Sequence, residues 1–440
     1  MDARPTADAV KGSYLANQGW NIGGALLSRA IEPLFLVLLA RALDPETFGV
    51  YALVVAVRAF YSVIKDLGLS VAIIVDQSGD DHRDLQMGVQ LVTALGGSGL
   101  LLFAASYIAD WMNERLLAEV LPWLCLTFFL SAIEDPIVTH LRKRNAYRLL
   151  FWRRALPTAG FGVTSVLLAF QGLGVMSLIW GHIVGQALNV IYLRGSAGRF
   201  PTPVVEVRRL RSLLRLGGHV TAQSVLGYLS LQADALITGR LLGSSALGVY
   251  RMAQQLAHII PMSVLGYVQE VLVTDAAAGA NHPGYLQLRY DQFLRLVPLS
   301  ILFALILYVA APSLIPWLLG EQWTLLVEPL QLVALTLISS HLVAANNELG
   351  RIIGIAPLYT TFSLFRTIAT LVAVWAGAMI SLDALVVAWV GVTIASNYAN
   401  GLLFQFSQSQ VKVPGWLHLV FAGLLVVFVL ETLPLLEMDA

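Results

Sequence analysis

The stretches RALDPETFGVY at residues 41–51 and RLLGSSALGVY at residues 240–250 carry one pattern in two distant parts of the chain. Five of their eleven positions are identical without a gap, and Asp76 and Asp275 fall in the same register beyond them. Each copy lies in the turn after the first long apolar segment of its half. This placement favours two equivalent halves that share one topology.

The composition requires most of the chain to lie in a membrane. Of 440 residues, 57% are hydrophobic and 12% charged, and the mean hydropathy is +0.74. Apolar runs of about 18 residues or more recur along the chain, and each is long enough to cross the bilayer as a helix. Runs such as 299–311 and 417–430 are continuously apolar, whereas strands of a membrane β-barrel alternate. The sequence therefore predicts repeated helical spans.

Turn signals between the apolar runs predict about thirteen spans. We expect an all-α, polytopic transmembrane helical bundle of two six-helix lobes, related by pseudo-two-fold symmetry, plus an extra C-terminal helix. The expected boundaries are an N-terminal lobe at 1–195, a cytoplasmic basic linker at 196–212, a C-terminal lobe at 213–410, and the extra helix with a short tail at 411–440.

The distribution of charge predicts the orientation. Alternate connections are rich in arginine, as at 142–148 and 194–211, whereas the opposite connections are short and nearly free of it. By the positive-inside rule the N-terminus is cytoplasmic. The short outer connections leave no extracytoplasmic domain for chemistry. A formal net charge of zero gives no basic field for nucleic acid.

Two predicted helices carry polar stripes that end in an acid. Their polar residues are spaced four, seven and four positions apart: Asn17, Asn21, Ser28 and Glu32 on the first helix, and His219, Gln223, Ser230 and Asp234 on the seventh. Because a charge within the bilayer costs several kcal/mol, each embedded charge should face a partner or a water-filled cavity.

Cationic and polar side chains on the cavity-forming helices are the candidate substrate-binding residues: Arg29, Arg58, Arg251, His258 and Arg366. Pairing within a helix is the alternative for Arg29, through Glu32 three residues away. Arg58 and Arg251 have no acid three or four residues away, which favours a role facing the lumen.

Other charged residues allow more than one interpretation. Lys65 has Asp66 or Asp76 as a possible partner. Glu134 and Asp135 fit either a proton relay or a kinked helix with one paired acid. No Walker motif, metal cluster or catalytic triad occurs in the sequence, so we expect no cofactor, no metal and no enzymatic activity.

Residues 39–76, LARALDPETFGVYALVVAVRAFYSVIKDLGLSVAIIVD, and residues 234–253, DALITGRLLGSSALGVYRMA, resemble the Wzx-type polysaccharide transporters of the multidrug/oligosaccharidyl-lipid/polysaccharide exporter superfamily. The resemblance implies two six-helix bundles, a central cavity and alternating access in a bacterial inner membrane. It implies polyprenyl-pyrophosphate-linked glycan as substrate, membrane lipids as surroundings, and polysaccharide polymerase and export machinery as candidate partners. The related lipid II flippases are similar in carrying cavity arginines on the first, second and eighth helices.

The expected function is a flippase that moves lipid-linked oligosaccharide units of exopolysaccharide or O-antigen from the cytoplasmic to the periplasmic leaflet. Guanidinium groups suit pyrophosphate because they form bidentate, charge-assisted hydrogen bonds. Glu32 and Asp234 are the candidate sites for a coupling proton or sodium ion. The alternatives are a cation-coupled multidrug antiporter of the same superfamily and a membrane glycan polymerase or ligase.

Overall fold

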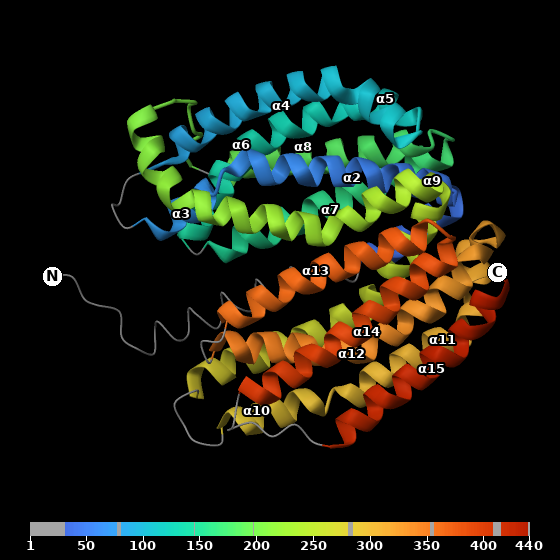
Figure 1. Cartoon of the computed structure of the whole chain (residues 1–440). Coiled ribbons are helices and arrows are strands. Elements are labelled where there is room, and N and C mark those ends of the chain that lie inside the picture. Colours follow the sequence, from blue (N-terminus) through green and yellow to red (C-terminus); the bar gives the residue numbers. More distant parts are fainter. Residues whose placement is uncertain are drawn as a thin grey trace. The chain divides into compact units, whose positions relative to one another are not determined.

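The computed structural model describes residues 31–76, 81–144, 146–196, 198–279, 285–352, 356–407 and 415–438. All regular structure within these ranges is helical, and none of it is strand (Figure 1). Eight helices of this part of the chain are long and apolar enough to cross a membrane. The expected all-α, polytopic membrane fold is therefore confirmed.

The chain divides into two compact units. Unit 1 comprises Met1–Leu43 and Val50–Leu231, and unit 2 comprises Asp44–Gly49 and Gln232–Ala440. Two helices, α2 (Pro45–Asp66) and α9 (Val207–Gly279), contribute residues to both units. The lobe and linker boundaries expected from the sequence stay a prediction.

Unit 1 is a bundle of helices in which α7 packs on α8, and α4 on α6. A Cβ atom at Gly185 of α8 would lie 2.6 Å from the carbonyl oxygen of Pro157 on α7, so glycine permits the close approach of these two backbones. The elements are a helix at 31–42, most of α2, α3 (Leu69–Val75), α4 (Arg83–Met112), α5 (Leu116–Val120), η1 (Leu121–Trp123), α6 (Leu124–Lys143), α7 (Tyr147–Phe170), α8 (Val175–Ser196) and the first part of α9.

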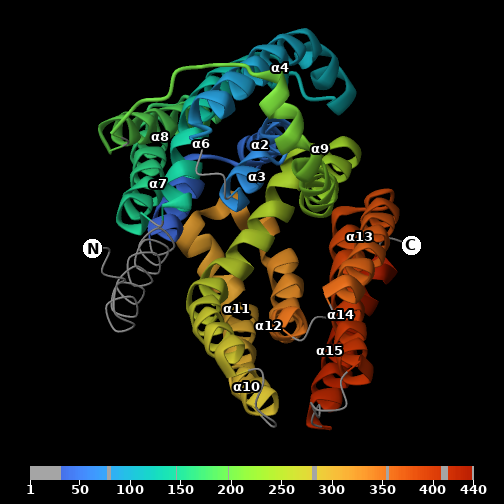
Figure 2. The ribbon, with the colours of Figure 1, turned by 90° about the vertical axis from the view of Figure 1, so that its left-hand side faces the viewer.

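An extended segment, residues 200–206, connects α8 to α9 and crosses the start of α4 (Figure 2). The backbone N–H of Thr202 donates to Asp84 Oδ1 (2.8 Å), and that of Val204 donates to the Asp84 carbonyl (3.1 Å). Arg199 pairs with the same carboxylate, and this hydrogen bond raises the pKa of its guanidinium. A Cβ at Gly88 would meet the Val204 carbonyl oxygen at 2.2 Å. These contacts hold the connection against the start of α4.

Several backbone breaks occur at residues with positive φ angles. Leu67 (φ 46°) and Gly68 (φ 72°) separate α2 from α3, and Asn113 (φ 55°) ends α4. Gly243 (φ 87°) interrupts α9, so this element is two helices joined at a sharp turn. Glycine and asparagine adopt this conformation at low cost, which explains their positions here.

Unit 2 contains the remainder of α9 and a group of long helices that run side by side (Figure 1). Buried amides join two of them: Asn346 of α12 donates to Asn400 of α14 (3.2 Å), and Asn397 of α14 donates to Ser339 of α12 (2.9 Å). The elements are α10 (Tyr285–Leu294), α11 (Val297–Leu319), η2 (Glu321–Leu326), α12 (Val327–Ile352), α13 (Ala356–Ala378), α14 (Leu382–Ser407) and α15 (Trp416–Met438).

The two repeat turns pack against each other within unit 2. A Cβ at Gly49 would lie 1.7 Å from the Ser244 carbonyl oxygen, and one at Gly248 would lie 1.8 Å from the Pro45 carbonyl oxygen. Gly49 and Gly248 hold matching positions in the repeat, as do Pro45 and Ser244. The contact is therefore reciprocal, as in a two-fold interface, and this agrees with the expected pseudo-symmetry.

This close contact makes Gly248 intolerant of a side chain. We expect Gly248→Val to lower the free energy of unfolding by about 1–3 kcal/mol, because the valine must displace the Pro45 backbone. The measurement is the thermal unfolding midpoint of the purified protein. Gly227→Val is the control, since its Cβ would meet no atom within 4 Å. Equal midpoints for the two variants would contradict the close contact.

Candidate functional site

A cavity of about 630 Å³ lies in unit 1 among the helix at 31–42, α2, α6, α7 and α8. Its lining is rich in charge for a membrane-spanning bundle. The charged lining residues are Glu32, Arg58, Lys65, Glu134, Asp135, Arg153 and Arg154. Four cations thus face three acids, and the pairing among them decides what the cavity can bind.

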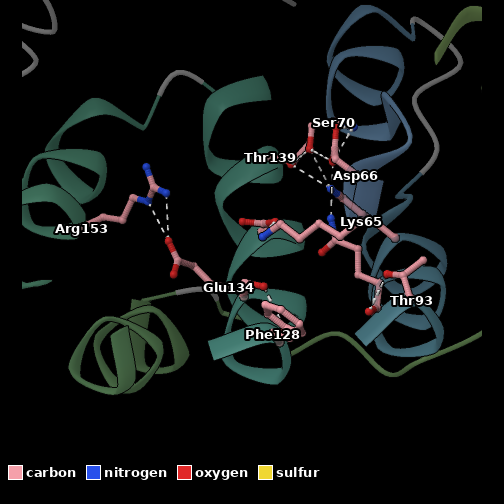
Figure 3. Close-up of polar contacts among 12 residues, drawn as sticks. Lys65, Asp66, Ser70, Thr93, Phe128, Glu134, Thr139 and Arg153 are labelled. Carbon is pink, nitrogen blue, oxygen red and sulfur yellow. Dashed lines mark hydrogen bonds and ion pairs between the residues drawn. The ribbon is translucent and has the colours of Figure 1, made fainter. Parts of the chain in front are cut away.

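Two neighbouring acids on α6 hold cations from two different helices (Figure 3). Glu134 accepts hydrogen bonds from Arg153 of α7, with Nη2 at 2.9 Å and Nε at 3.1 Å. Asp135 pairs with Lys65 of α2, with 2.8 Å between Nζ and Oδ2. Consecutive helical residues point in different directions, so one short segment binds both walls. Lys65 and Glu134 are buried, which makes the loss of either partner expensive.

Arg58 and Arg154 are the cavity cations that remain available. Neither side chain makes a hydrogen bond or an ion pair with another residue that the structure describes. Arg58 is half-buried on α2, and Arg154 is exposed on α7 next to the paired Arg153. A guanidinium keeps its charge in such a place and offers a planar set of donors. The cavity therefore offers two guanidinium groups to an anion, and its charged lining has an excess of one cation over the acids when Glu32 is counted.

A polar network braces the end of α2 beside these ion pairs (Figure 3). The Ser70 hydroxyl donates to Asp66 Oδ1 (2.5 Å), and the backbone N–H of Ser70 also points to this carboxylate (3.3 Å). Gln86 of α4 donates to Ser70 Oγ and to Thr139 Oγ1 of α6, both at 3.1 Å. The network connects α2, α3, α4 and α6, and so fixes the segment that presents Lys65.

In unit 2 the candidate residue Arg251 is paired. Its Nη2 lies 3.0 Å from Asp234 Oδ1, and its Nη1 donates to Gln254 (3.1 Å). The hydroxyl of Tyr250 donates to the other oxygen of Asp234 (3.1 Å). The two candidates are seventeen positions apart, and the turn at Gly243 brings them together. Because the partner is not one helical turn away, the spacing along the sequence does not reveal this ion pair.

The other candidates fall in several places. Glu32 lines the unit 1 cavity together with Arg58. His258 on α9 and Arg366 on α13 are half-buried residues of unit 2, and neither side chain has a hydrogen-bond or ion-pair partner among the described residues. Arg29 lies outside the described residues.

Residues of α7 and α8 complete the cavity, although the sequence analysis did not select them. Arg153 and Arg154 form an arginine doublet inside the apolar segment that becomes α7, and two charges in such a segment were the available signal. The paired Glu134 and Asp135 show that both acids of α6 have partners, where a relay or one paired acid was expected. The actual partner of Lys65 is Asp135, not the expected Asp66 or Asp76.

Comparison with known proteins identifies the relatives of this chain. The profile of a family described as "Polysaccharide biosynthesis protein" matches residues 38–328. The chain is 23% identical over 387 residues to the lipopolysaccharide biosynthesis protein WzxC of Escherichia coli (strain K12), covering 85% of this chain and 77% of that protein. It is 25% identical over 398 residues to the succinoglycan biosynthesis transport protein ExoT of Rhizobium meliloti (strain 1021), covering 85% and 76%.

A solved structure supports the fold. The lipid II flippase MurJ in an inward closed conformation aligns with a TM-score of 0.71 at 13% identity, over 94% of this chain and 92% of that chain. The resemblance found in the sequence is thus confirmed by the family profile, the relatives and the fold.

The Glu134–Arg153 pair can be tested directly. Glu134→Gln leaves the Arg153 guanidinium half-buried without a counter-charge, and we expect it to lower the free energy of unfolding by about 1–3 kcal/mol. The double variant Glu134→Gln/Arg153→Gln should recover most of that loss, because neither charge remains. Chemical denaturation of the purified variants measures both changes. Strictly additive losses would show that the two side chains do not interact.

Proposed function

The chain belongs to the polysaccharide biosynthesis protein family, and from this premise we propose that it flips polyprenyl-pyrophosphate-linked oligosaccharide units across the bacterial inner membrane. It is a multi-pass membrane transporter, and its family and relatives are not enzymes. The movement runs from the cytoplasmic to the periplasmic leaflet, with the N-terminus in the cytoplasm. The cargo is a repeat unit of exopolysaccharide or O-antigen. The printed names of relatives, a succinoglycan transport protein and a putative O-antigen transporter, support this cargo class.

The physical task explains why a polar cavity is needed. Sugar hydroxyls and a pyrophosphate cannot cross hydrocarbon unaided, because each unpaired polar group costs several kcal/mol there. The polyprenyl chain can remain in lipid throughout. The protein therefore has to shelter only the headgroup, and the cavity of unit 1 offers polar surface for it.

The observation that carries the proposal is the pairing pattern in this cavity. Glu134 and Asp135 neutralise Arg153 and Lys65, while Arg58 and Arg154 stay without carboxylate partners among the described residues. Two guanidiniums match the two negative charges of a pyrophosphate diester and can bind it through bidentate hydrogen bonds. Arg58 and Arg154 are therefore the proposed anchors of the headgroup.

The remaining candidates belong to the second part of the transport cycle. After the headgroup has left Arg58 and Arg154, it is proposed to contact the other candidates: Arg29, Arg251, His258 and Arg366. Arg251 must first release Asp234, its present partner. Protonation or sodium binding at Asp234 would weaken that ion pair, so Asp234 and Glu32 are the proposed sites of ion coupling.

A drug/cation antiporter is the alternative function within the superfamily. An antiporter for organic cations needs an acidic and aromatic chamber, whereas two of the three cavity acids here are neutralised by ion pairs. The available charge in the cavity is cationic and would repel such substrates. We expect a deletion strain to keep its drug susceptibility, and a panel of cationic drugs measures this. A marked rise in susceptibility, reversed by the intact chain, would favour the antiporter.

Removal of the cavity guanidiniums tests the flippase. We expect Arg58→Ala/Arg154→Ala to reduce translocation at least about 100-fold, since two charge-assisted contacts of about 1.5–3 kcal/mol each are lost. The measurement is the leaflet distribution of lipid-linked intermediates in a deletion strain that expresses the variant.

A matched control removes a cation that lies away from the cavity. Arg115→Ala, in the connection between α4 and α5, should leave translocation unchanged at equal membrane abundance. Full translocation by the Arg58→Ala/Arg154→Ala variant at normal abundance would exclude both residues from headgroup binding.

A further inference from the structure

The cavity of unit 1 has a second polar surface, which carries no charged group. His182, Gln186 and Asn189 lie on one face of α8, four and three residues apart, and all three line the cavity. We name this set the α8 stripe. None of the three side chains makes a hydrogen bond with another residue that the structure describes.

Two amide oxygens of the α8 stripe lie buried without a hydrogen-bond partner among the described residues. Asn189 is 2% exposed, and its Oδ1 lies buried without a donor, as does Oε1 of Gln186. A buried polar group without a partner costs about 1–3 kcal/mol, so most such groups in proteins are satisfied. Both residues line the same cavity, so a ligand bound there can supply the missing hydrogen-bond donors.

An aromatic ring lies next to the stripe. Phe161 of α7 also lines the cavity, makes an edge contact with the His182 ring (6.4 Å between centroids), and stacks on Tyr51 (6.4 Å, 24°). The apolar C–H face of a sugar ring packs well on such an aromatic surface. Neighbouring amides and imidazole then reach the hydroxyl groups at the rim of the sugar.

We infer that the α8 stripe is a subsite for the first sugar of the lipid-linked glycan, and that this sugar is neutral, with hydroxyl or acetamido substituents. The inference rests on the proposed function, because it places the sugar next to a pyrophosphate held by Arg58 and Arg154. Amide groups both donate and accept hydrogen bonds, which matches hydroxyl and acetamido groups.

Charge in the cavity separates neutral from acidic sugars. The pyrophosphate takes Arg58 and Arg154, which have no carboxylate partner among the described residues, and Lys65 and Arg153 are held by Asp135 and Glu134. The carboxylate of a uronic acid would find no further cation there. It would also lie in the same cavity as Glu32 and the two α6 acids. An acidic first sugar is therefore disfavoured.

The size of the cavity limits how much of the glycan it holds. A volume of about 630 Å³ falls within the range of about 300–1,000 Å³ that suits a compact ligand. A pyrophosphate with its first sugar fits this volume, and because the cavity is open, further sugars can extend beyond it. Selectivity at the stripe therefore concerns the sugar next to the lipid.

The test measures binding of three probes to the full chain in nanodiscs. The probes are the methyl diester of undecaprenyl pyrophosphate, which is sugar-free and carries the same two pyrophosphate charges, and the N-acetylglucosamine and glucuronic acid conjugates of undecaprenyl pyrophosphate. We expect the N-acetylglucosamine conjugate to bind about tenfold more tightly than the sugar-free probe, which corresponds to about 1.4 kcal/mol. The glucuronic acid conjugate should show no such gain.

Variants of the stripe then show where the gain arises. In Gln186→Leu/Asn189→Leu the gain from N-acetylglucosamine should fall to within about twofold, while the affinity for the sugar-free diester probe stays unchanged. That unchanged affinity also shows that the variant folds. Ile191→Ala, on the exposed side of α8, is the matched control and should keep the full gain.

The possible results distinguish a failure of the sugar subsite from a failure of the proposed flippase function. Equal binding of the sugar-free and N-acetylglucosamine probes to the unmodified chain, or a full gain in the double leucine variant, would overturn the subsite and leave the flippase intact. If the glucuronic acid conjugate binds as tightly as the N-acetylglucosamine conjugate, or more tightly, the inferred preference for a neutral first sugar is wrong. Failure of all three probes to bind would overturn the subsite and the proposed function together.

Discussion

The two adjacent acids of α6 determine the character of the unit 1 cavity. Glu134 and Asp135 reach opposite walls and hold Arg153 and Lys65. Without them the cavity would carry four cations, and the helices that present those cations would repel one another at low dielectric. With them, Arg58 and Arg154 are the cavity cations that stay without a carboxylate partner among the described residues, and Glu32 is the remaining acid. The same two carboxylates thus hold three helices together and set the charge that a ligand meets.

This arrangement separates the groups that support the cavity from those proposed to bind. Lys65 and Arg153 are committed to ion pairs, and the network of Asp66, Ser70, Gln86 and Thr139 fixes the helix end beside them. Fixed surroundings keep the binding groups in place and reduce the ordering cost of binding. The α8 stripe adds neutral groups to the same chamber, so charge and hydrogen bonding address different parts of one headgroup.

The fold was predictable from the sequence because the bilayer allows few solutions. Continuous apolar runs such as 299–311 must become helices, since every backbone group in lipid needs an internal partner. The repeat was also informative, because Gly49 and Gly248 keep the residue type that a close backbone contact requires. Arg58 could be selected because no acid lies one helical turn away.

The pairing pattern could not be predicted in the same way. Glu134 meets Arg153 nineteen positions later, and Asp135 meets Lys65 from a helix far earlier in the chain. Such partners depend on how helices pack, which spacing along one helix does not encode. Gln186 and Asn189 are inconspicuous for a related reason: a neutral amide in an apolar helix becomes informative only when a cavity is found beside it.

The reciprocal contact of the repeat turns also bears on ancestry. Gly49 contacts the backbone of Ser244, and Gly248 contacts the backbone of Pro45, which holds the matching position in the other copy. Two identical copies related by a two-fold axis make contacts of this reciprocal kind. A single six-helix gene whose product dimerised through this turn would have needed one glycine to serve both sides. A fused duplicate of such a gene has to keep this glycine in both copies, because a side chain at either position would meet the backbone of the other turn.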